Sequence, residues 1–555
     1  MGARLLTRWI NDPLISKKEI EKRQDSVEEL YNNIILRGSI IEILKKIYDI
    51  ERIAGKIIYG TENGKDLLSL KDSIRKSLET YRLLKEHQEI KNILDIDVKI
   101  LLDIYNKIEL IIDTEAPFSV REGGIIKDGY NSELDELRKI SKLGKDFILE
   151  IEQRERERTG IKGLKIKYNK VFGYFIEVTK ANEHLVPEDY IRKQTLVNSE
   201  RYIVPDLKEY EEKVITAKSK IEALEYELFK QLTSEIKEHI DSLYKLANRI
   251  ANLDIVSNFA HIATKNSYVK PEMNEGEILE IKGGRHPIVE TLIPSGTYVK
   301  NDIILDDKNN LIILTGPNMS GKSTYMKQVA LNIIMAHIGS YVAADYAKIP
   351  IVDKIFTRVG ASDDLLTGQS TFMLEMTEVA SILNSATKKS FVVLDEIGRG
   401  TSTYDGISIA TAITEYIHNV IGAKTIFATH YHELTELSIS LTHLKNFHVA
   451  TLEKDGQVTF LHKIEEGPAD KSYGIHVAKI AGLPVDLLER ADSILTHLES
   501  QDKQVVSQQK ATTEQISLFE APQSSPVLEE LRNLDIYNMT PLEVMAAVSE
   551  MKKKL

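Results

Sequence analysis

Residues 314–328 read LTGPNMSGKSTYMKQ, in which Gly316 is followed after four residues by Gly321-Lys322-Ser323. An apolar run ends at Leu314, and the glycines separate it from a helical pattern, so the stretch predicts a strand, a loop and a helix. Such a loop turns backbone N–H groups, a helix N-terminus and a lysine toward phosphate, and its serine hydroxyl can ligate Mg²⁺. The predicted nucleotide-binding residues are Gly316, Pro317, Asn318, Met319, Ser320, Gly321, Lys322, Ser323 and Thr324.

Two further apolar runs end in residues suited to phosphate chemistry. FVVLDEIGRGTST (391–403) places Asp395 where a magnesium ligand belongs and Glu396 where a base could orient water. FATH ends at His430, at the sheet edge where ligands of α/β domains bind, and we expect it to sense or polarise the γ-phosphate. Taken alone, an acidic helix cap and a structural histidine are the alternatives, but the order after Lys322 favours an ATP–Mg²⁺ site.

Composition sets the broad class. The chain has 555 residues, 42% of them hydrophobic, which is enough for three or four folded units. It has no cysteine, so disulfides, thiol catalysis and thiolate zinc are excluded, and no apolar run is long enough for a membrane span. We therefore expect a cytoplasmic protein. The net charge of −12 does not exclude nucleic acid, because local basic patches bind it.

Changes of periodicity divide the chain. Helical spacing runs through most of the N-terminal part, alternation typical of a hairpin appears in LKIKYNKVFGYFIEV, and strands alternate with helices from about residue 280 to 498. This indicates a multidomain α and α/β fold. We expect a helical core and lever (1–158), a β-rich clamp (159–208), a lever helix returning to the core (209–270), a P-loop ATPase (271–500), a disordered linker (501–527) and a C-terminal helix (528–555).

Four motifs together resemble the ATPase domain of the MutS family of DNA mismatch-repair proteins. They are GPNMSGKSTYMKQ, DDLLTGQSTFMLEM, LDEIGRGTSTYDG and FATHYHEL, in that order. GARLLTRWINDPL resembles the opening of the family's core, YNKVFGYFIEVTKAN and TLVNSERYIVPDLKEYE its clamp, and GRHPIVE the start of its ATPase. The resemblance covers nearly the whole chain.

The resemblance implies an ABC-class ATPase in which two subunits enclose the nucleotide. The family's trans-acting serine falls on Ser370, and its adenine-contacting positions fall on Tyr298 and His462, although packing is an alternative role for both. KSYGIHVAKIAGLPVDLLERA resembles the helix-turn-helix through which the family's subunits dimerise. A mismatch-reading domain and a connector precede the core in full-length members, so we expect a fragment without specific mismatch recognition.

The β-rich segment has the opposite charge to the whole. Residues 162–201 hold eight basic and five acidic residues, a net charge of +3. Basic side chains alternating with aromatic ones on a hairpin fit phosphate contact without base readout, although a solvated face is the alternative. The candidate residues for binding double-stranded DNA are Lys165, Lys167, Lys170, Arg192, Lys193 and Arg201.

Further along, Gln515-Ile516-Ser517-Leu518-Phe519 resembles the peptide by which bacterial repair proteins bind the sliding clamp, and a chance match is the alternative. We therefore predict a homodimeric mismatch-repair ATPase, with tetramers through the final helix left open, that contacts DNA, MutL and the sliding clamp at the bacterial nucleoid. The alternatives are a truncated DNA-binding or dimerisation module with little turnover, and a MutS paralogue in recombination.

Overall fold

The computed structural model describes residues 1–87, 90, 92–169, 173–294, 296–317, 320–360, 371–454, 457–468 and 474–508. The chain forms two compact units. The first comprises Met1–Pro271 with Ile334–Val342, and the second comprises Glu272–Ile333 with Ala343–Leu555. Over the described ranges, no helix is long and apolar enough to cross a membrane.

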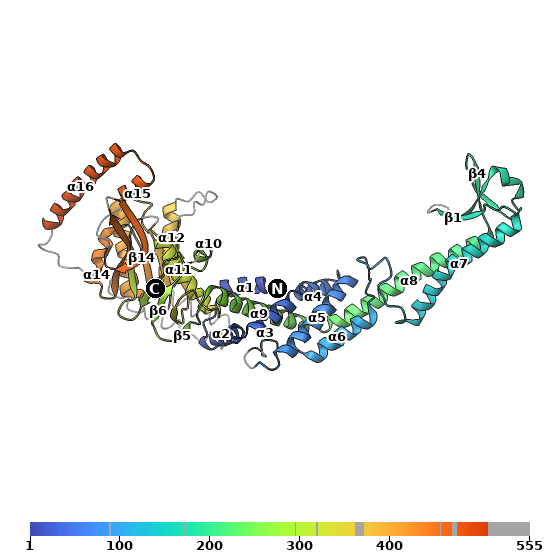
Figure 1. The fold of residues 1–555 in the computed structure, drawn as a ribbon, viewed down its shortest axis with the longest axis horizontal. Helices are drawn as coiled ribbons and strands as arrows, with labels where there is room; N and C mark the ends of the chain where they lie inside the picture. Colours follow the sequence, from blue (N-terminus) through green and yellow to red (C-terminus); the bar gives the residue numbers. More distant parts are fainter. Residues whose placement is uncertain are drawn as a thin grey trace, which may run out of the picture. The chain divides into compact units, whose positions relative to one another are not determined.

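The first unit is built on a helical core (Figure 1). Its long helix α9 packs against α1, α2, α3 and α4, and it buries an apolar stripe that includes Leu246 and Ile250. Side-chain caps fix several helix starts, as in the reciprocal hydrogen bonds between Asn63 and Asp66 at α5. The core helices are α1 (Gly2–Asn11), α2 (Lys17–Asn32), α3 (Ile34–Leu44), α4 (Ile50–Tyr59), α5 (Gly64–Leu84), α6 (Val98–Ile111) and α9 (Ile240–Asn266).

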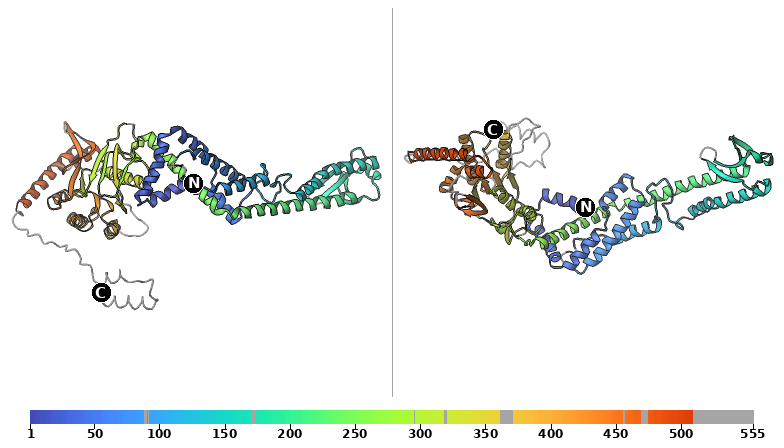
Figure 2. Two further views of the ribbon diagram at one scale, coloured as in Figure 1. Left: turned by 90° about the horizontal axis from the view of Figure 1, so that it is seen from below. Right: turned by 45° about the horizontal axis from the view of Figure 1, so that its top comes forward.

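Two long helices of the same unit, α7 (Ser132–Thr159) and α8 (Pro205–Lys237), lie side by side and carry a small sheet at one end (Figure 2). Arg154 pairs with Asp206 at 2.6 Å and Arg138 with Glu225 at 2.7 Å, so the helices are antiparallel. The sheet has the order β1-β2-β4-β3. Its elements are β1 (Lys165–Asn169), β2 (Gly173–Thr179), η1 (Lys180–Leu185), β3 (Ile191–Thr195) and β4 (Ser199–Ile203). The β1–β2 pairing confirms the predicted hairpin.

The second unit contains two sheets. The larger has the order β10-β11-β12-β8-β13-β14, and all its neighbours are parallel except β13 and β14. Its strands are β8 (Leu311–Thr315), β10 (Ile355–Arg358), β11 (Phe391–Asp395), β12 (Lys424–Ala428), β13 (Leu444–Lys454) and β14 (Gln457–Glu466). The smaller sheet, of order β5-β9-β6-β7, holds β5 (Glu272–Asn274), β6 (Leu279–Gly284), β7 (Asn301–Leu305) and β9 (Tyr346–Pro350).

Helices cover the larger sheet. Helix α11 (Lys322–His337) follows β8 directly, α12 (Thr371–Ser385) precedes β11, and α13 (Thr403–Tyr416) lies between β11 and β12 in the chain. The remaining elements are α10 (Val289–Leu292), η2 (Ile417–Ile421), η3 (His432–Glu436), α14 (Leu437–Ser440), α15 (Gly474–Ile480) and α16 (Val485–Gln508). This alternation of parallel strands and helices is the predicted α/β pattern.

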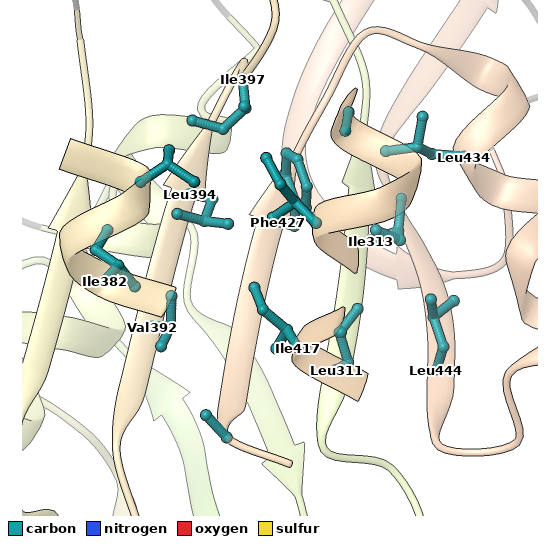
Figure 3. Packing of buried hydrophobic residues seen from close by; sticks show 14 of the residues in the cluster. Leu311, Ile313, Ile382, Val392, Leu394, Ile397, Ile417, Phe427, Leu434 and Leu444 are labelled. Carbon is teal, nitrogen blue, oxygen red and sulfur yellow. The ribbon is translucent and has the colours of Figure 1, made fainter. Parts of the chain in front are cut away.

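A continuous apolar core lies on one face of the larger sheet (Figure 3). Leu311 and Ile313 of β8 and Phe427 of β12 pack there against residues of α12, α13 and η2. Alternate residues such as Ile312 and Ile426 are equally buried, so the central strands are covered on both faces. Polar side chains can therefore approach these strands only beyond their ends.

Helix α16 departs from the sequence prediction. The linker is predicted to begin at residue 501, but the helix continues to Gln508. The added stretch, QDKQVVSQ, contains no glycine or proline and is rich in Gln, which is a good helix former. Low hydrophobicity suggests disorder, whereas local helix propensity explains the extension. The rest of the predicted linker and the final helix lie outside the described residues.

Replacing Phe427 by Ala tests the core of the second unit. Phe427 is fully buried, so the cavity should lower the free energy of unfolding by about 3–5 kcal/mol. Ile439→Ala is the matched control, because Ile439 is 88% exposed and should change it by less than about 0.5 kcal/mol. Denaturant unfolding monitored by circular dichroism measures both, and equal effects would contradict this packing.

Candidate functional site

The loop between β8 and α11 is shaped by two glycines. Gly316 has φ +142° and Gly321 has φ +106°, a region that favours glycine. A Cβ on Gly321 would lie 3.3 Å from Nδ1 of His462, and one on Gly316 would lie 3.2 Å from a methyl carbon of Val449. The chain therefore needs glycine at both ends of the loop for its close approach to β13 and β14.

Lys322 points back into this loop. Its ammonium group donates hydrogen bonds to the carbonyl of Gly316 and, at 3.3 Å, to that of Pro317. The residue is only 4% exposed, and burial lowers the pKa of its ammonium group. A desolvated cation inside a glycine loop is suited to an anionic ligand such as phosphate, which would replace these carbonyl partners.

Ser323 and Asp395 form a pair next to the loop. The Ser323 hydroxyl donates to Oδ2 of Asp395 at 2.8 Å, whereas Oδ1 of Asp395 is buried without a hydrogen-bond partner among the described residues. Burial raises the pKa of this carboxyl group. The hydroxyl and the unpartnered carboxylate oxygen suit Mg²⁺, which binds through one or two protein ligands plus phosphate oxygens. Over the described ranges, no cluster of three metal-ligating side chains exists, and a site of this kind does not need one.

Glu396 follows Asp395 in an unusual backbone conformation. Its φ is +52°, and its N–H donates to the carbonyl of Ala428 at 2.9 Å, which ties it to the end of β12. Its carboxylate accepts from Arg399 at 2.6 Å. Left-handed φ at a non-glycine residue costs of order 1–3 kcal/mol and persists where the surroundings fix it. The Glu396 backbone is thus held in place by the protein itself.

His430 lies beyond the end of β12, the strand between β8 and β11. Its ring contacts that of Tyr431, with centroids 4.4 Å apart. Although the residue as a whole remains accessible to solvent, the protein around the imidazole desolvates it and lowers its pKa, so the neutral form dominates at pH 7. The strand order therefore brings His430 between the glycine loop and the Asp395–Glu396 turn.

A hollow of about 290 Å³ adjoins the loop at Gly321 and Thr324. It is lined by Tyr298 and His462, the two residues that fall on the adenine-contacting positions of the family. The Tyr298 hydroxyl donates to Oε1 of the buried Gln328 at 2.9 Å. His462, at φ +54°, has its Nδ1 at 2.7 Å from the Ser320 carbonyl. An aromatic ring, an imidazole and mainly apolar walls next to a phosphate-type loop suit a flat heterocyclic base.

A second hollow, of about 310 Å³, lies on the side of the Asp395–Glu396 turn. The sequence patterns do not select several of its residues, namely Arg358, Glu375 and Arg399. Arg399 lies in LDEIGRGTSTYDG and Glu375 in DDLLTGQSTFMLEM, so both fall within motifs that carry the family resemblance, whereas Arg358 lies outside all of these motifs. The hollow has room for small ligands beside the Glu396 carboxylate.

The candidate DNA-contacting residues of the small sheet differ in their surroundings. Lys167 pairs with Glu177 at 3.2 Å and Arg192 with Glu200 at 2.9 Å, while Arg201 donates to Gln194 at 2.7 Å. Lys165 and Lys193 are exposed and form no ion pair among the described residues. Lys193 sits at an irregularity between Arg192 and Gln194, where a bulge redirects the side chain.

Several predicted site residues lie outside the described part of the chain. They are Asn318 and Met319 of the loop, the trans-acting Ser370, Lys170 of the hairpin, and Gln515, Leu518 and Phe519 of the sliding-clamp peptide. Their roles remain predictions from the sequence.

Comparison with known proteins agrees with the geometry. The family description "MutS domain III" matches residues 1–260, and "MutS domain V" matches residues 312–499. The whole chain aligns with "DNA mismatch repair protein MutS" of Fusobacterium nucleatum at 76% identity and of Caldanaerobacter subterraneus at 50%. It aligns at 47% identity with that of Listeria monocytogenes. The chain spans 63%, 64% and 66% of the lengths of these three relatives.

Asp395→Asn tests the proposed metal ligand. The amide preserves the shape of the side chain but removes its negative charge. The factor by which Mg²⁺ raises the affinity for a nucleoside triphosphate should therefore be at least about 10-fold smaller in the variant than in the unsubstituted chain, a difference of roughly 1.4 kcal/mol. Binding without Mg²⁺ should change little. Asp492→Asn, on exposed helix α16, is the matched control. Calorimetric titration with and without Mg²⁺ measures both, and an unchanged metal effect in Asp395→Asn would exclude this carboxylate as a ligand.

Proposed function

The chain belongs to the MutS family, and on that premise we propose that it is an ATP-hydrolysing, DNA-binding component of DNA mismatch repair. One observation carries the ATPase part. The buried Lys322 follows the glycine loop and points back into it. The next residue, Ser323, donates a hydrogen bond to Asp395, whose second carboxylate oxygen is buried without a hydrogen-bond partner among the described residues. A cation for phosphate and a ligand pair for its metal thus occur together.

The proposed reaction is attack of water on the γ-phosphate of ATP, which gives ADP and phosphate. Lys322 neutralises phosphate charge. Ser323 and Asp395 would hold Mg²⁺, which when bound would stabilise the charge that develops on the phosphate oxygens. Glu396 accepts the proton of the attacking water. Neutral His430, at the end of the intervening strand, is available to donate a hydrogen bond to the γ-phosphate.

Tyr298 and His462 are proposed to hold adenine in the hollow beside Gly321. The Tyr298–Gln328 hydrogen bond supports this role, because it fixes the orientation of the aromatic ring. The His462 backbone is fixed as well, since Asn301 donates its side-chain amide to the His462 carbonyl at 2.9 Å. The proposed adenine site and the proposed phosphate site therefore share the glycine loop that ends at Gly321.

We propose that the active form is a homodimer in which Ser370 reaches the nucleotide of the partner. Large apolar side chains are exposed around the turn between α15 and α16, among them Leu483, Val485 and Leu487. Exposed apolar residues grouped in this way are typical of an interaction surface. They support the helix-turn-helix as the dimer interface, with the final helix as the candidate for tetramer formation.

The small β sheet is proposed as the double-stranded-DNA contact. Exposed Lys165 and Lys193 support phosphate binding without base readout. ATP binding and DNA binding should be coupled reciprocally, because any effect of nucleotide on DNA affinity must equal the effect of DNA on nucleotide affinity. MutL and the sliding clamp are the proposed protein partners, the latter through residues 515–519, at the nucleoid in the bacterial cytoplasm.

Glu396→Ala tests the assignment of the base. Removing the carboxylate should reduce kcat for ATP hydrolysis at least about 100-fold, since a general base contributes roughly 10²–10⁴-fold, while ATP affinity stays nearly unchanged. Glu436→Ala, an exposed glutamate in η3, is the matched control. Unchanged turnover in Glu396→Ala would contradict the assignment. Background turnover in the unsubstituted dimer would instead identify a DNA-binding or dimerisation module.

Lys165→Ala combined with Lys193→Ala tests the DNA contact. If each lysine neutralises one phosphate, the slope of log K against log salt concentration should fall by about 1.8 in magnitude, at about 0.9 per contact. The loss should be equal for matched and mismatched duplexes. Lys18→Ala with Lys265→Ala removes the same charge from exposed positions of the helical core and should leave the slope unchanged. Fluorescence anisotropy over a salt series measures it, and identical slopes for all variants would place DNA binding elsewhere.

A further inference from the structure

The peptide unit of Gly398 is held by side chains from two distant elements. Its N–H donates to Oε1 of Glu375, on α12, at 2.6 Å. Its carbonyl accepts from the hydroxyl of Tyr431, which follows β12, at 3.0 Å. Glu375 and Tyr431 are each 7% exposed, so both hydrogen bonds are shielded from water.

The surrounding backbone is packed so that this arrangement is possible. Gly398 has φ +88°, and a Cβ there would lie 2.8 Å from backbone atoms of Gly406 in α13. A Cβ on Gly406 would lie 2.4 Å from the Tyr431 hydroxyl oxygen and 2.5 Å from the Gly398 carbonyl oxygen. Only glycine at 398 and 406 lets the Tyr431 hydroxyl reach the loop.

The same turn carries Glu396. The Glu396 N–H bonds to Ala428 at 2.9 Å, and Ile397 between it and Gly398 is fully buried. The backbone of Glu396, with its strained φ, is therefore fixed on one side by the hydrogen bond of its own N–H and on the other by the two hydrogen bonds of the Gly398 peptide. Strain of this kind is retained only where neighbouring contacts leave the backbone no relaxed alternative.

We propose that Glu375 and Tyr431 are positioning residues for ATP hydrolysis, which fix the Gly398 peptide and thereby the direction of the Glu396 carboxylate. This inference rests on the proposed function of Glu396 as the base. In this role both residues act through the backbone two residues beyond Glu396 and not directly on the reacting atoms. A displaced carboxylate orients water poorly, and a shift of about 1 Å can cost on the order of 100-fold in rate.

Four variants separate positioning from mere packing. Tyr431→Phe removes only the hydroxyl, and Glu375→Ala removes the acceptor of the N–H bond together with the rest of the carboxylate side chain, so each should lower kcat about 10-fold or more while KM for ATP changes less than about 2-fold. Glu375→Gln keeps an acceptor oxygen and should restore kcat to within about 3-fold. The double variant Glu375→Ala with Tyr431→Phe should lose less than the product of the single losses, because both act on one peptide. Tyr404→Phe, on an exposed tyrosine of α13, is the matched control and should not change kcat.

Amide hydrogen exchange tests the inference independently of turnover. In Tyr431→Phe, which leaves the Glu375 acceptor intact, the amides of Glu396 and Gly398 should exchange at least about 10-fold faster, with melting temperature close to that of the unsubstituted chain. Three results would overturn the inference. They are unchanged amide exchange together with unchanged kcat, equal losses in kcat and in ATP affinity, and failure of Glu375→Gln to restore kcat. Absence of turnover in the unsubstituted chain would refute the proposed function instead, and the exchange measurement would still decide whether these residues position the turn.

Discussion

The site depends on the order of the three buried parallel strands β11, β12 and β8. Their backbone groups bond within the sheet and their side chains are covered on both faces, so the groups that can meet a ligand lie where the strands end. The ladder continues one residue past these ends, since Thr429 bonds to the Leu314 carbonyl at 3.0 Å and Glu396 to that of Ala428 at 2.9 Å. This register aligns the loop, the histidine turn and the acidic turn at one edge, and no side chain alone could do so.

Backbone strain is concentrated where chemistry is proposed. Among the described residues, the non-glycine positions with positive φ are Ser267, Glu396 and His462, and two of these three border the proposed nucleotide site. Buried hydrogen bonds hold both. Asn301, only 4% exposed, donates to the His462 carbonyl and accepts from the Ile464 N–H, while Glu375 and Tyr431 hold the turn after Glu396. The protein's own contacts thus organise the site, which limits the ordering that binding and catalysis must still bring about.

The small sheet shows why a charge count overstates phosphate contacts. Cross-strand neighbours bring Lys167 and Arg201 to the same Glu177, and the Arg201 guanidinium also lies over the Phe175 ring at 4.4 Å. These cations stabilise the sheet, so moving them onto DNA would leave Glu177 unpaired. A small sheet that offers few uncommitted cations would bind DNA weakly and release it readily as salt rises. Such a contact would be easily changed by the nucleotide state of the other unit, because little binding energy has to be overcome.

The sequence predicts this site where its residues are contiguous and fails where they are joined by the fold. Lys322, Asp395, Glu396 and His430 each end or follow an apolar strand, so one local pattern finds them all. Gln328, Glu375 and Tyr431 act through partners 30, 23 and 33 residues away, and no spacing marks such contacts. The motif LDEIGRGTSTYDG does not reveal that a Cβ on Gly406 would meet the hydroxyl of Tyr431, which follows another strand. A motif therefore identifies which chemical groups are present. Their orientation depends on long-range packing, which cannot be inferred from a single sequence.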